Sequence, residues 1–372
     1  MFANLPSGWE QLPQQAVAKF YNGRAYKLKE WEDTGTPVIR LQNLTGSGNK
    51  FYYSKLKLPE HQYCVKGDLL YMWSATFGPH IWDGDRAIYH YHIWKVEQAH
   101  NKLDRTFHFF ILSHLTEQWK SGANGMAMLH LTKKGMEQLT IPVPPLSEQK
   151  RIAEILTAVD DSIRAGERVI EQTERVKKGL MEELLTGGLG SAAIERGEVP
   201  TGWRQDVFEK LVRLKRGYDL PVSQRIEGSV PVVASNGPVG THNSPAVEGP
   251  VVVTGRSGTI GKVALYETEC HPLNTTLYSQ KTHGNNIRYI YYFLCWFRLG
   301  RFGTGTGVPT LNRNDVHAQQ IVIPSLPEQK RIATILTSID DQIEAERKHV
   351  EQQKRLKQGL MDDLLTGRVR TV

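Results

Sequence analysis

The chain has 372 residues, 40% of them hydrophobic, and a formal net charge of +7. This length predicts two to four structural units, and no apolar run reaches the roughly eighteen residues that a membrane-spanning helix needs. The three cysteines, Cys64, Cys270 and Cys295, are far apart and odd in number, which argues against a disulfide framework and a cysteine-based zinc site.

The first segment predicts a compact unit without a targeting signal. Residues 1–9 lack the charged start and apolar stretch of a signal peptide, so we expect a cytoplasmic protein. Residues 6–9 (PSGW) return as PTGW at residues 200–203, which marks the start of two halves. Between about 1 and 140, short strand-like runs alternate with Gly, Asn and Pro turns, and residues 106–121 have a helical pattern. We predict an α/β or α+β unit.

The next segment is a repeat. Residues 141–189 align without a gap with residues 321–369, at an offset of 180 residues, and 27 of the 49 positions are identical. Apolar residues recur at three- and four-residue spacing in both copies, and Gly187 or Gly367 ends each pattern. Each copy therefore predicts an amphipathic helix of about 40 residues, or roughly 60 Å.

The single narrow apolar stripe on each predicted helix needs a partner, and the nearest partner is the other copy. We expect an antiparallel coiled coil and approximate twofold symmetry. The aspartate pairs at residues 160–161 and 340–341 occupy matching positions. Because a helix places neighbouring residues on different faces, these pairs favour a scaffold or docking role over paired-carboxylate catalysis.

The second varied segment, about 200–320, shares little sequence with the first beyond its opening motif, and residues 189–199 link it to the first helix. Its pattern predicts strands at residues 230–234 and 251–254 and a helix at residues 287–299. It is expected to form a second α/β or α+β unit.

Basic charge is concentrated in the varied segments. Residues 147–187 carry a net charge of −2 and residues 327–367 carry −1, which leaves +10 for the rest of the chain. A basic balance is a weak indication of a polyanionic partner, since many basic proteins bind nothing acidic. Its concentration in the two varied segments favours nucleic acid.

The alternation of two varied domains with two repeated helices resembles the specificity subunit of Type I restriction–modification systems. Each helix begins with P-x-L-x-EQKRIA, at residues 144–153 and 324–333, and ends with GLM-x-x-LLTG, at residues 179–187 and 359–367. The varied segments resemble two types of target-recognition domain, one through residues 37–43, 67–84 and 125–134, and the other through residues 234–240, 253–262 and 303–312.

This resemblance implies target-recognition domains at 1–144 and 189–324 and spacer helices at 145–188 and 325–372. It implies a non-catalytic chain that binds no cofactor, with each domain reading one half of a two-part sequence in double-stranded DNA. Two modification subunits, which use S-adenosylmethionine to methylate adenine at N6, would dock on the helices that set the spacer. Restriction subunits, which are translocases, would add cleavage that depends on ATP and Mg²⁺. No membrane partner is implied.

Candidate DNA contacts in the first domain combine aromatic, small polar and basic side chains near glycines. The alternatives are core positions for Trp73 and Trp82 and a solvated cluster for the lysines. His90 and His92 are expected to be structural, because no third metal ligand accompanies them. The predicted contacts are Arg40, Asn43, Trp73, Ser74, Thr76, His80, Met126, His130, Lys133 and Lys134.

Candidate DNA contacts in the second domain lie largely in two glycine-rich segments. Residues 255–262 (GRSGTIGK) do not form a Walker A loop, because the glycine spacing is wrong and Val263 follows the lysine; a structural hairpin turn is the alternative. Residues 303–307 (GTGTG) predict a tight turn, and asparagine and arginine are common partners of adenine and guanine. The predicted contacts are Ser235, Asn236, Arg256, Ser257, Lys262, Thr310, Asn312 and Arg313.

The start of each repeat is predicted to dock the modification subunits through Glu148, Gln149, Arg151, Glu328, Gln329 and Arg331. Catalysis by this chain is disfavoured, because the NPP[YF] and DPP[YF] tetrapeptides of amino-methyltransferases are absent from the sequence. The alternative from a different class is a coiled-coil adaptor protein that makes only weak, nonspecific contact with DNA.

Overall fold

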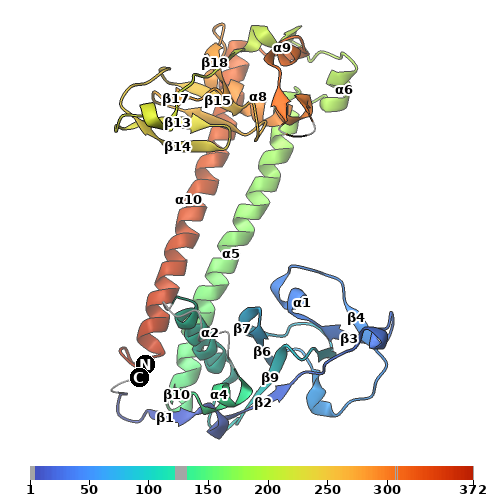
Figure 1. Ribbon diagram of the computed structural model, residues 1–372, viewed down its shortest axis with the longest axis vertical. Coiled ribbons are helices and arrows are strands. Elements are labelled where there is room, and N and C mark those ends of the chain that lie inside the picture. The colour runs from blue at the N-terminus through green and yellow to red at the C-terminus, as the bar shows by residue number, and fades with distance from the viewer. Residues whose placement is uncertain (1–4, 122–131, 306, 308, 372) are drawn as a thin grey trace. The chain divides into compact units, whose positions relative to one another are not determined.

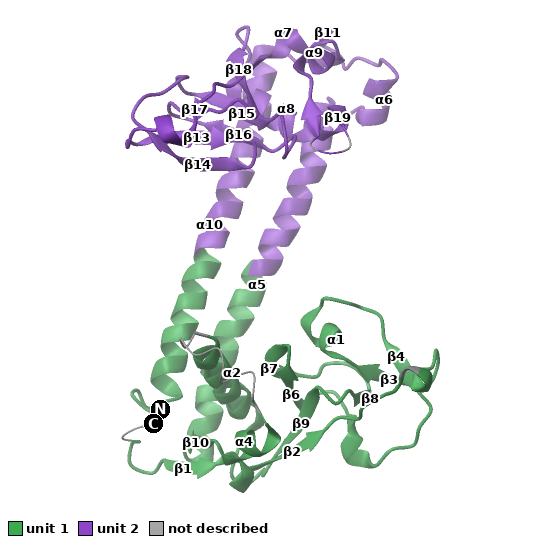
Figure 2. Cartoon of the chain, in the orientation of Figure 1, with its two compact units in different colours: residues 1–166, 349–372 green, residues 167–348 purple. Residues whose placement is uncertain are grey.

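The computed structural model describes residues 5–121, 132–305, 307 and 309–371. The chain divides into unit 1, Met1–Gly166 with His349–Val372, and unit 2, Glu167–Lys348 (Figure 2). Both predicted long helices are present, as α5 (Leu146–Leu185, 40 residues) and α10 (Leu326–Leu364, 39 residues) (Figure 1). Each unit contains part of both helices, so the compact units cut across the four segments predicted from the repeats.

Unit 1 contains two four-stranded sheets and a two-stranded ribbon among its described residues. One sheet has the antiparallel order β2–β9–β6–β7. The other has the order β4–β3–β8–β5, and in it β3 and β8 are parallel. The ribbon pairs β1 with β10. The strands are β1 (Glu10–Pro13), β2 (Ala18–Asn22), β3 (Thr36–Ile39), β4 (Tyr52–Ser54), β5 (Tyr63–Cys64), β6 (Leu69–Ser74), β7 (Thr76–Ile81), β8 (Ala87–Tyr89), β9 (Ile93–Gln98) and β10 (Thr140–Val143).

Unit 2 repeats much of this topology with a different sequence. Its four-stranded sheet has the order β12–β18–β15–β16, and its three-stranded sheet β14–β13–β17 contains the parallel pair β13 and β17. A ribbon pairs β11 with β21, and a hairpin pairs β19 with β20. The strands are β11 (Arg204–Val207), β12 (Arg213–Arg216), β13 (Val230–Ala234), β14 (Gly237–His242), β15 (Val251–Gly255), β16 (Val263–Tyr266), β17 (His271–Pro272), β18 (Thr276–Lys281), β19 (Gly303–Thr304), β20 (Thr310–Leu311) and β21 (Gln320–Ile323).

Among the described residues, each unit has one principal helix outside the repeats, close to its predicted position. These helices are α2 (Arg105–Ser121) in unit 1 and α8 (Ile287–Phe297) in unit 2. Each packs in a hydrophobic core with residues of both long helices. The shorter helices are α1 (Leu41–Thr45) and α4 (Lys133–Gln138) in unit 1, and α6 (Ser191–Glu195), α7 (Phe208–Leu211) and α9 (Arg313–His317) in unit 2.

One glutamine of each repeat joins a long helix to the helix of the varied domain. In unit 1, Gln149 Oε1 accepts from the Asp104 backbone N–H at 2.7 Å, directly before α2. In unit 2, Gln329 Oε1 accepts from the Asn286 backbone N–H at 2.9 Å, directly before α8. Both glutamine side chains are buried. The glutamine of the EQ pair therefore fixes each domain helix to its long helix.

The glycine that ends each repeat packs on the opening motif of a half. A Cβ on Gly187 would overlap Pro200 and approach Trp203, and a Cβ on Gly367 would overlap Pro6. Both glycines have positive φ, +58° and +76°, a region that other residues rarely adopt. This packing explains why LLTG and P-x-G-W are both present twice.

Matching ion pairs join the long helices inside each unit. Lys357 Nζ lies 2.6 Å from Asp160 Oδ1 in unit 1, and Lys177 Nζ lies 2.5 Å from Asp340 Oδ1 in unit 2. The first aspartate of each pair thus contacts the other helix, which agrees with the expected scaffold role. Asp161, the second aspartate of the first pair, forms an ion pair with Arg164 on its own helix.

Two histidines of α2, His108 and His114, are buried, and His108 is expected to make unit 1 sensitive to acid. His108 Nε2 donates to Gln14 Oε1 at 2.8 Å, which places the proton on Nε2, and Nδ1 accepts from Gln98 Nε2 at 3.2 Å. Burial lowers the pKa of His108 to about 3. Below the ordinary pKa near 6.5, the unfolded chain binds this proton and the folded chain does not.

We therefore expect the stability of unit 1 to fall as pH drops from about 6.5 towards 3, with His108 contributing up to about 1.4 kcal/mol per pH unit. Hydrogen exchange measured across this pH range in the wild type and in His108→Gln isolates that contribution as a difference in slope. Equal slopes in the two proteins would contradict the assignment.

Candidate nucleic-acid interface

The two units share a close contact between a glycine that follows a strand and the turn that follows the parallel strand pair. Gly23 directly follows β2 in the sequence, and it packs so closely that a Cβ there would overlap the carbonyl oxygen of His90. Gly217 directly follows β12, and a Cβ there would overlap the carbonyl oxygen of Leu273 in the same way. The turn between β8 and β9 (residues 90–92) thus corresponds to the turn between β17 and β18 (residues 273–275).

The hydrogen bonds of the two turns correspond residue by residue. The His92 carbonyl oxygen accepts from Trp73 N, and the Thr275 carbonyl oxygen accepts from Arg256 N. The side chains of the same two donors reach the middle of each turn: Trp73 Nε1 donates to the Tyr91 carbonyl oxygen at 2.8 Å. Arg256 Nη1 approaches the Asn274 carbonyl oxygen at 3.5 Å. The predicted contacts Trp73–Ser74 and Arg256–Ser257, taken from unrelated motifs, therefore occupy equivalent positions.

Arg40 directly follows the parallel strand β3, in a group of aromatic side chains. Its guanidinium lies 5.8 Å from the ring centre of Trp31 and 5.2 Å from that of Tyr52. Trp73 is half-buried and stacks on Trp94, with ring centres 5.7 Å apart. These contacts hold flat, partly exposed groups and a cation next to the β8–β9 turn.

Other predicted contacts of unit 1 lie in different surroundings. The Asn43 side chain forms hydrogen bonds with the chain's own backbone: its Oδ1 accepts from Arg40 N, and its Nδ2 donates to the Gly48 and Lys50 carbonyl oxygens. Thr76 is exposed at the tip of the β6–β7 hairpin, opposite the half-buried Ser74. His80 is half-buried on β7, and burial lowers its pKa. Trp82 is a core residue, only 8% exposed.

The lysines predicted to lie in a phosphate-facing loop instead belong to helix α4. Thr132 caps this helix by accepting from Gly135 N, and Lys133 forms an ion pair of 3.3 Å with Glu137. Lys134 is exposed. The loop prediction was made from the charge cluster alone and missed the capping threonine. Met126 and His130 lie outside the described residues.

In unit 2, most predicted contacts come together at one end of β13 and β15. Lys262 Nζ donates to the Asn236 carbonyl oxygen at 2.5 Å. Ser257 forms a β-bridge with Thr310, and a Cβ on Gly258 would lie 3.6 Å from Ser235 Oγ. Residues 255–262 connect β15 to β16, so they form a hairpin turn, the structural alternative, and also carry these polar groups.

Asn312 and Arg313 have other roles in unit 2. Asn312 caps α9, because its side chain accepts from Asn314 N. Arg313 lines a separate surface cavity of about 500 Å³ together with Arg213 and His317. The predicted tight turn at residues 303–307 begins as strand β19 of a hairpin.

Comparison with known proteins identifies the family. The family model for the Type I restriction modification DNA specificity domain matches residues 6–175 and 205–353, one match for each half of the chain. The chain belongs to the Type I restriction–modification specificity subunits.

Relatives support the same assignment along the whole chain. The MjaVIII specificity subunit of Methanocaldococcus jannaschii is 27% identical over 406 aligned positions, which cover 98% of this chain and 94% of the relative. The EcoBI specificity subunit of Escherichia coli is 23% identical over 230 positions and covers 57% of this chain and 48% of that subunit.

Solved structures show the same fold at low sequence identity. The S subunit of the Type I system of M. genitalium superposes with a TM-score of 0.65 at 14% identity, over 98% of each chain. A chain solved in a study of assembly and conformational transition of the type I system has a TM-score of 0.63 at 18% identity, over 99% of this chain and all of that one.

The six residues that were predicted to dock partner subunits differ in their burial. Glu148, Gln149 and Gln329 are at most 1% exposed and form hydrogen bonds within the chain. Direct contact of these three with a partner would require those bonds to break. Arg151 and Arg331 are exposed, and Glu328 is half-buried in an ion pair with Arg331.

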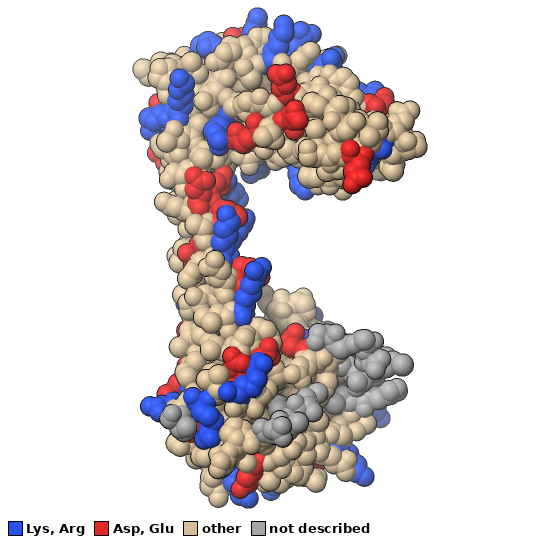
Figure 3. All heavy atoms as spheres, turned by 90° about the vertical axis from the view of Figure 1, so that its left-hand side faces the viewer, with Lys and Arg blue, Asp and Glu red and all other residues tan. Residues whose placement is uncertain are grey.

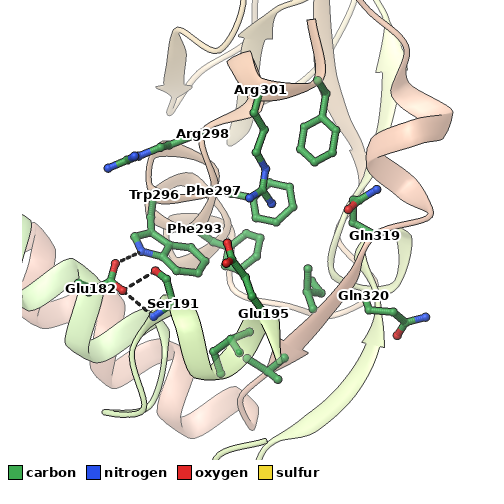
Figure 4. A pocket seen from close by; sticks show the side chains of 14 residues that line it. Glu182, Ser191, Glu195, Phe293, Trp296, Phe297, Arg298, Arg301, Gln319 and Gln320 are labelled. Atoms are coloured by element: carbon green, nitrogen blue, oxygen red, sulfur yellow. Dashed lines mark hydrogen bonds between the residues drawn. The ribbon is translucent and has the colours of Figure 1, made fainter. Parts of the chain in front are cut away.

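Unit 2 contains a cavity of about 470 Å³, which is lined by the C-terminal end of α5, by helix α6 and by helix α8 (Figure 4). Glu182 accepts from Trp296 Nε1 at 2.7 Å and from the backbone and hydroxyl of Ser191. Arg301 lies over the Phe297 ring, with its guanidinium 4.5 Å from the ring centre. The described lining residues include no histidine, cysteine or lysine. Through these hydrogen bonds, Glu182 of α5 holds the start of α6 next to α8.

The exposed surface of the long helices mixes both signs of charge. On the face shown in Figure 3, basic and acidic side chains lie next to one another along the helices. Exposed ion pairs of the long helices include Arg347–Glu174 and Lys348–Glu344 in unit 2 and Arg355–Glu351 in unit 1. Among the described residues, no group of three acidic, histidine or cysteine side chains is placed to hold a metal ion. No described helix is long and apolar enough to cross a membrane.

Sequence reasoning missed two parts of the site. The aromatic group around Trp31 and Tyr52 was not named, because these residues are distant in sequence from Arg40 and no spacing connects them. The β17–β18 turn was also not named, since residues 273–275 (LNT) have no motif of their own. The signal for both was the parallel strand pair, which becomes visible only in the tertiary fold.

Proposed function

We propose that this chain reads a two-part sequence in double-stranded DNA, one part with each unit, as the specificity subunit of a Type I restriction–modification complex. The observation that carries the proposal is the equivalence of Trp73–Ser74 in unit 1 and Arg256–Ser257 in unit 2. Two domains with different sequences present different side chains at one topological position. Such an arrangement suits two binding surfaces that read different bases.

The long helices are proposed to pair as an antiparallel coiled coil with approximate twofold symmetry, which sets the unread spacer between the half-sites. The ion pairs Asp160–Lys357 and Asp340–Lys177 support this pairing, because each connects matching positions of the two repeats. Val176 and Leu356 also occupy matching positions and are 56% and 50% exposed. Equivalent exposed positions on two helices suit two copies of one partner, which we propose are two modification subunits.

Catalysis is assigned to the partners. The modification subunits would bind S-adenosylmethionine and methylate adenine at N6, and restriction subunits would use ATP and Mg²⁺ for translocation and cleavage. This chain would supply sequence recognition and the scaffold. The DNA-facing residues that we retain are the groups at the strand ends, which are Arg40, Trp73, Ser74, Ser235, Asn236, Arg256, Ser257, Lys262 and Thr310.

The decisive test is co-expression of this chain with its modification subunit in a host that lacks both, followed by mapping of N6-methyladenine across the genome. We expect one bipartite motif with an unread spacer, present only when both proteins are made. A continuous motif would contradict reading by two separate domains. A stable complex without any methylated motif would favour the adaptor alternative.

A further inference from the structure

The β8–β9 turn of unit 1 and the β17–β18 turn of unit 2 share a feature beyond their backbone. At the last position of each turn, one polar side-chain atom is buried without a hydrogen-bond partner in the described part of the chain. These atoms are His92 Nε2 and Thr275 Oγ1. A buried polar atom without a partner costs free energy, so its recurrence at equivalent positions of two unrelated sequences requires an explanation.

Neither side chain is fully buried. His92 and Thr275 are both half-buried, so a change of rotamer can bring either polar atom to a partner at the surface. In unit 1, the neighbouring Tyr91 is 40% exposed, with its ring centre 3.9 Å from that of His92. The turn is thus open to solvent on one side and supported by the protein on the other.

The support comes from residues already placed in the candidate interface. The His92 ring lies 5.6 Å from the ring of Trp73, and Trp73 holds the Tyr91 carbonyl oxygen. In unit 2, the backbone of Arg256 and Ser257 holds the Thr275 carbonyl oxygen at 2.8 and 3.1 Å. The two turns are therefore held in place while their terminal polar atoms stay unpaired.

The chemistry of both positions suits base edges. Burial and the charge of Arg40 lower the pKa of His92, so near neutral pH its ring is uncharged and offers one donor and one acceptor. The Thr275 hydroxyl likewise donates and accepts. Base edges in the major groove present both kinds of group in patterns that differ between base pairs.

We propose that these two turns are equivalent recognition elements, and that His92 and Thr275 are specificity-determining residues that contact base edges of the two DNA half-sites. The inference rests on the proposed function. It reassigns His92, expected from sequence to be structural, and adds Thr275, which no sequence motif indicated.

The test uses two variants that keep the shape of each side chain. His92→Phe keeps a ring against Trp73, and Thr275→Val is isosteric. Each full-length variant is co-expressed with the modification subunit, and its methylation motif and its affinity for the wild-type site are measured. We expect His92→Phe to relax or change bases in one half-site only, and Thr275→Val in the other half-site only. Each should lower affinity for the wild-type site by about 5- to 100-fold, the range of a good polar base contact.

The control variants are His100→Ala in unit 1 and Thr268→Val in unit 2, both at exposed positions that do not belong to the turns. They should leave motif and affinity unchanged. Thermal denaturation provides a second measurement: removal of an unpaired hydroxyl should leave the Tm of Thr275→Val equal or higher. A fall of several degrees would show that the hydroxyl is paired and would overturn the inference.

The outcomes separate the inference from the proposed function. If the wild type gives a bipartite motif and both variants give the same motif with the same affinity, the inference is wrong and the proposed function stands. If the wild type gives no motif, the proposed function itself fails. If one variant alters both half-sites equally, the turn supports the fold or the assembly and does not read bases.

Discussion

Replacement of Glu148 by alanine is expected to lower the free energy of unfolding of unit 1 by about 3 kcal/mol, because Arg370 and the buried Trp9 indole lose the carboxylate that accepts their hydrogen bonds. The Glu148 side chain is fully buried. Its carboxylate accepts from Trp9 Nε1 at 3.0 Å and from two nitrogens of Arg370 at 2.7 and 2.9 Å. Arg370 also donates to the Ser7 carbonyl oxygen, so the carboxylate organises both chain ends.

The same residue of the second repeat provides the control. Within the described residues, the ion-pair partner of Glu328 is Arg331, whose side chain is 56% exposed, and exposed pairs contribute less than about 1 kcal/mol. Glu328→Ala should therefore leave unit 2 nearly unchanged. Hydrogen exchange under mild denaturant measures the two units of one molecule separately. Equal losses in the two variants would contradict the structural difference between the repeats.

The stabilisation that Glu148 provides is expected to depend on pH. Burial raises the pKa of the Glu148 carboxyl, but hydrogen bonds from Arg370 and Trp9 outweigh burial and hold the pKa below its ordinary value. The stabilisation is therefore present above the ordinary pKa of about 4.5 and lost as pH falls through the lower, folded value. The difference between wild type and Glu148→Ala should shrink in acid.

Replacement of Gln329 by alanine is expected to destabilise unit 2 by about 3 kcal/mol, because it removes three hydrogen bonds of about 1 kcal/mol each. Gln329 accepts from Asn286 N and donates to Asn285 Oδ1 and the Pro324 carbonyl oxygen. These bonds fix the start of α8 to the start of α10. We expect α8 to lose protection from hydrogen exchange before the sheets of unit 2 do.

Gln172→Ala, an exposed glutamine of α5 in unit 2, is the matched control and should change stability by less than about 0.5 kcal/mol. Gln149→Ala should produce the corresponding loss in unit 1, since Gln149 makes three similar bonds at the start of α2. A loss of DNA reading without loss of stability would instead favour a direct docking role for these glutamines.

The long helices and the two halves were predictable because their signals are local. A gap-free repeat, a three- and four-residue apolar spacing and a terminal glycine all act within one helix, so residues 141–189 and 321–369 specify their secondary structure without distant contacts. The strands at residues 230–234 and 251–254 and the helices α2 and α8 were predicted for the same reason.

The sequence by itself determined the secondary structure of the repeats, the division into two halves and the resemblance to specificity subunits. Only the tertiary structure decided which repeated residues are equivalent in role. Glu148 and Glu328 share one motif, yet only Glu148 is buried against an arginine, because Arg370 follows the second repeat where Gly190 follows the first. Likewise, His92 and Thr275 have no common pattern in sequence. They occupy equivalent positions in the two units because each unit contains a parallel strand pair and a close glycine contact.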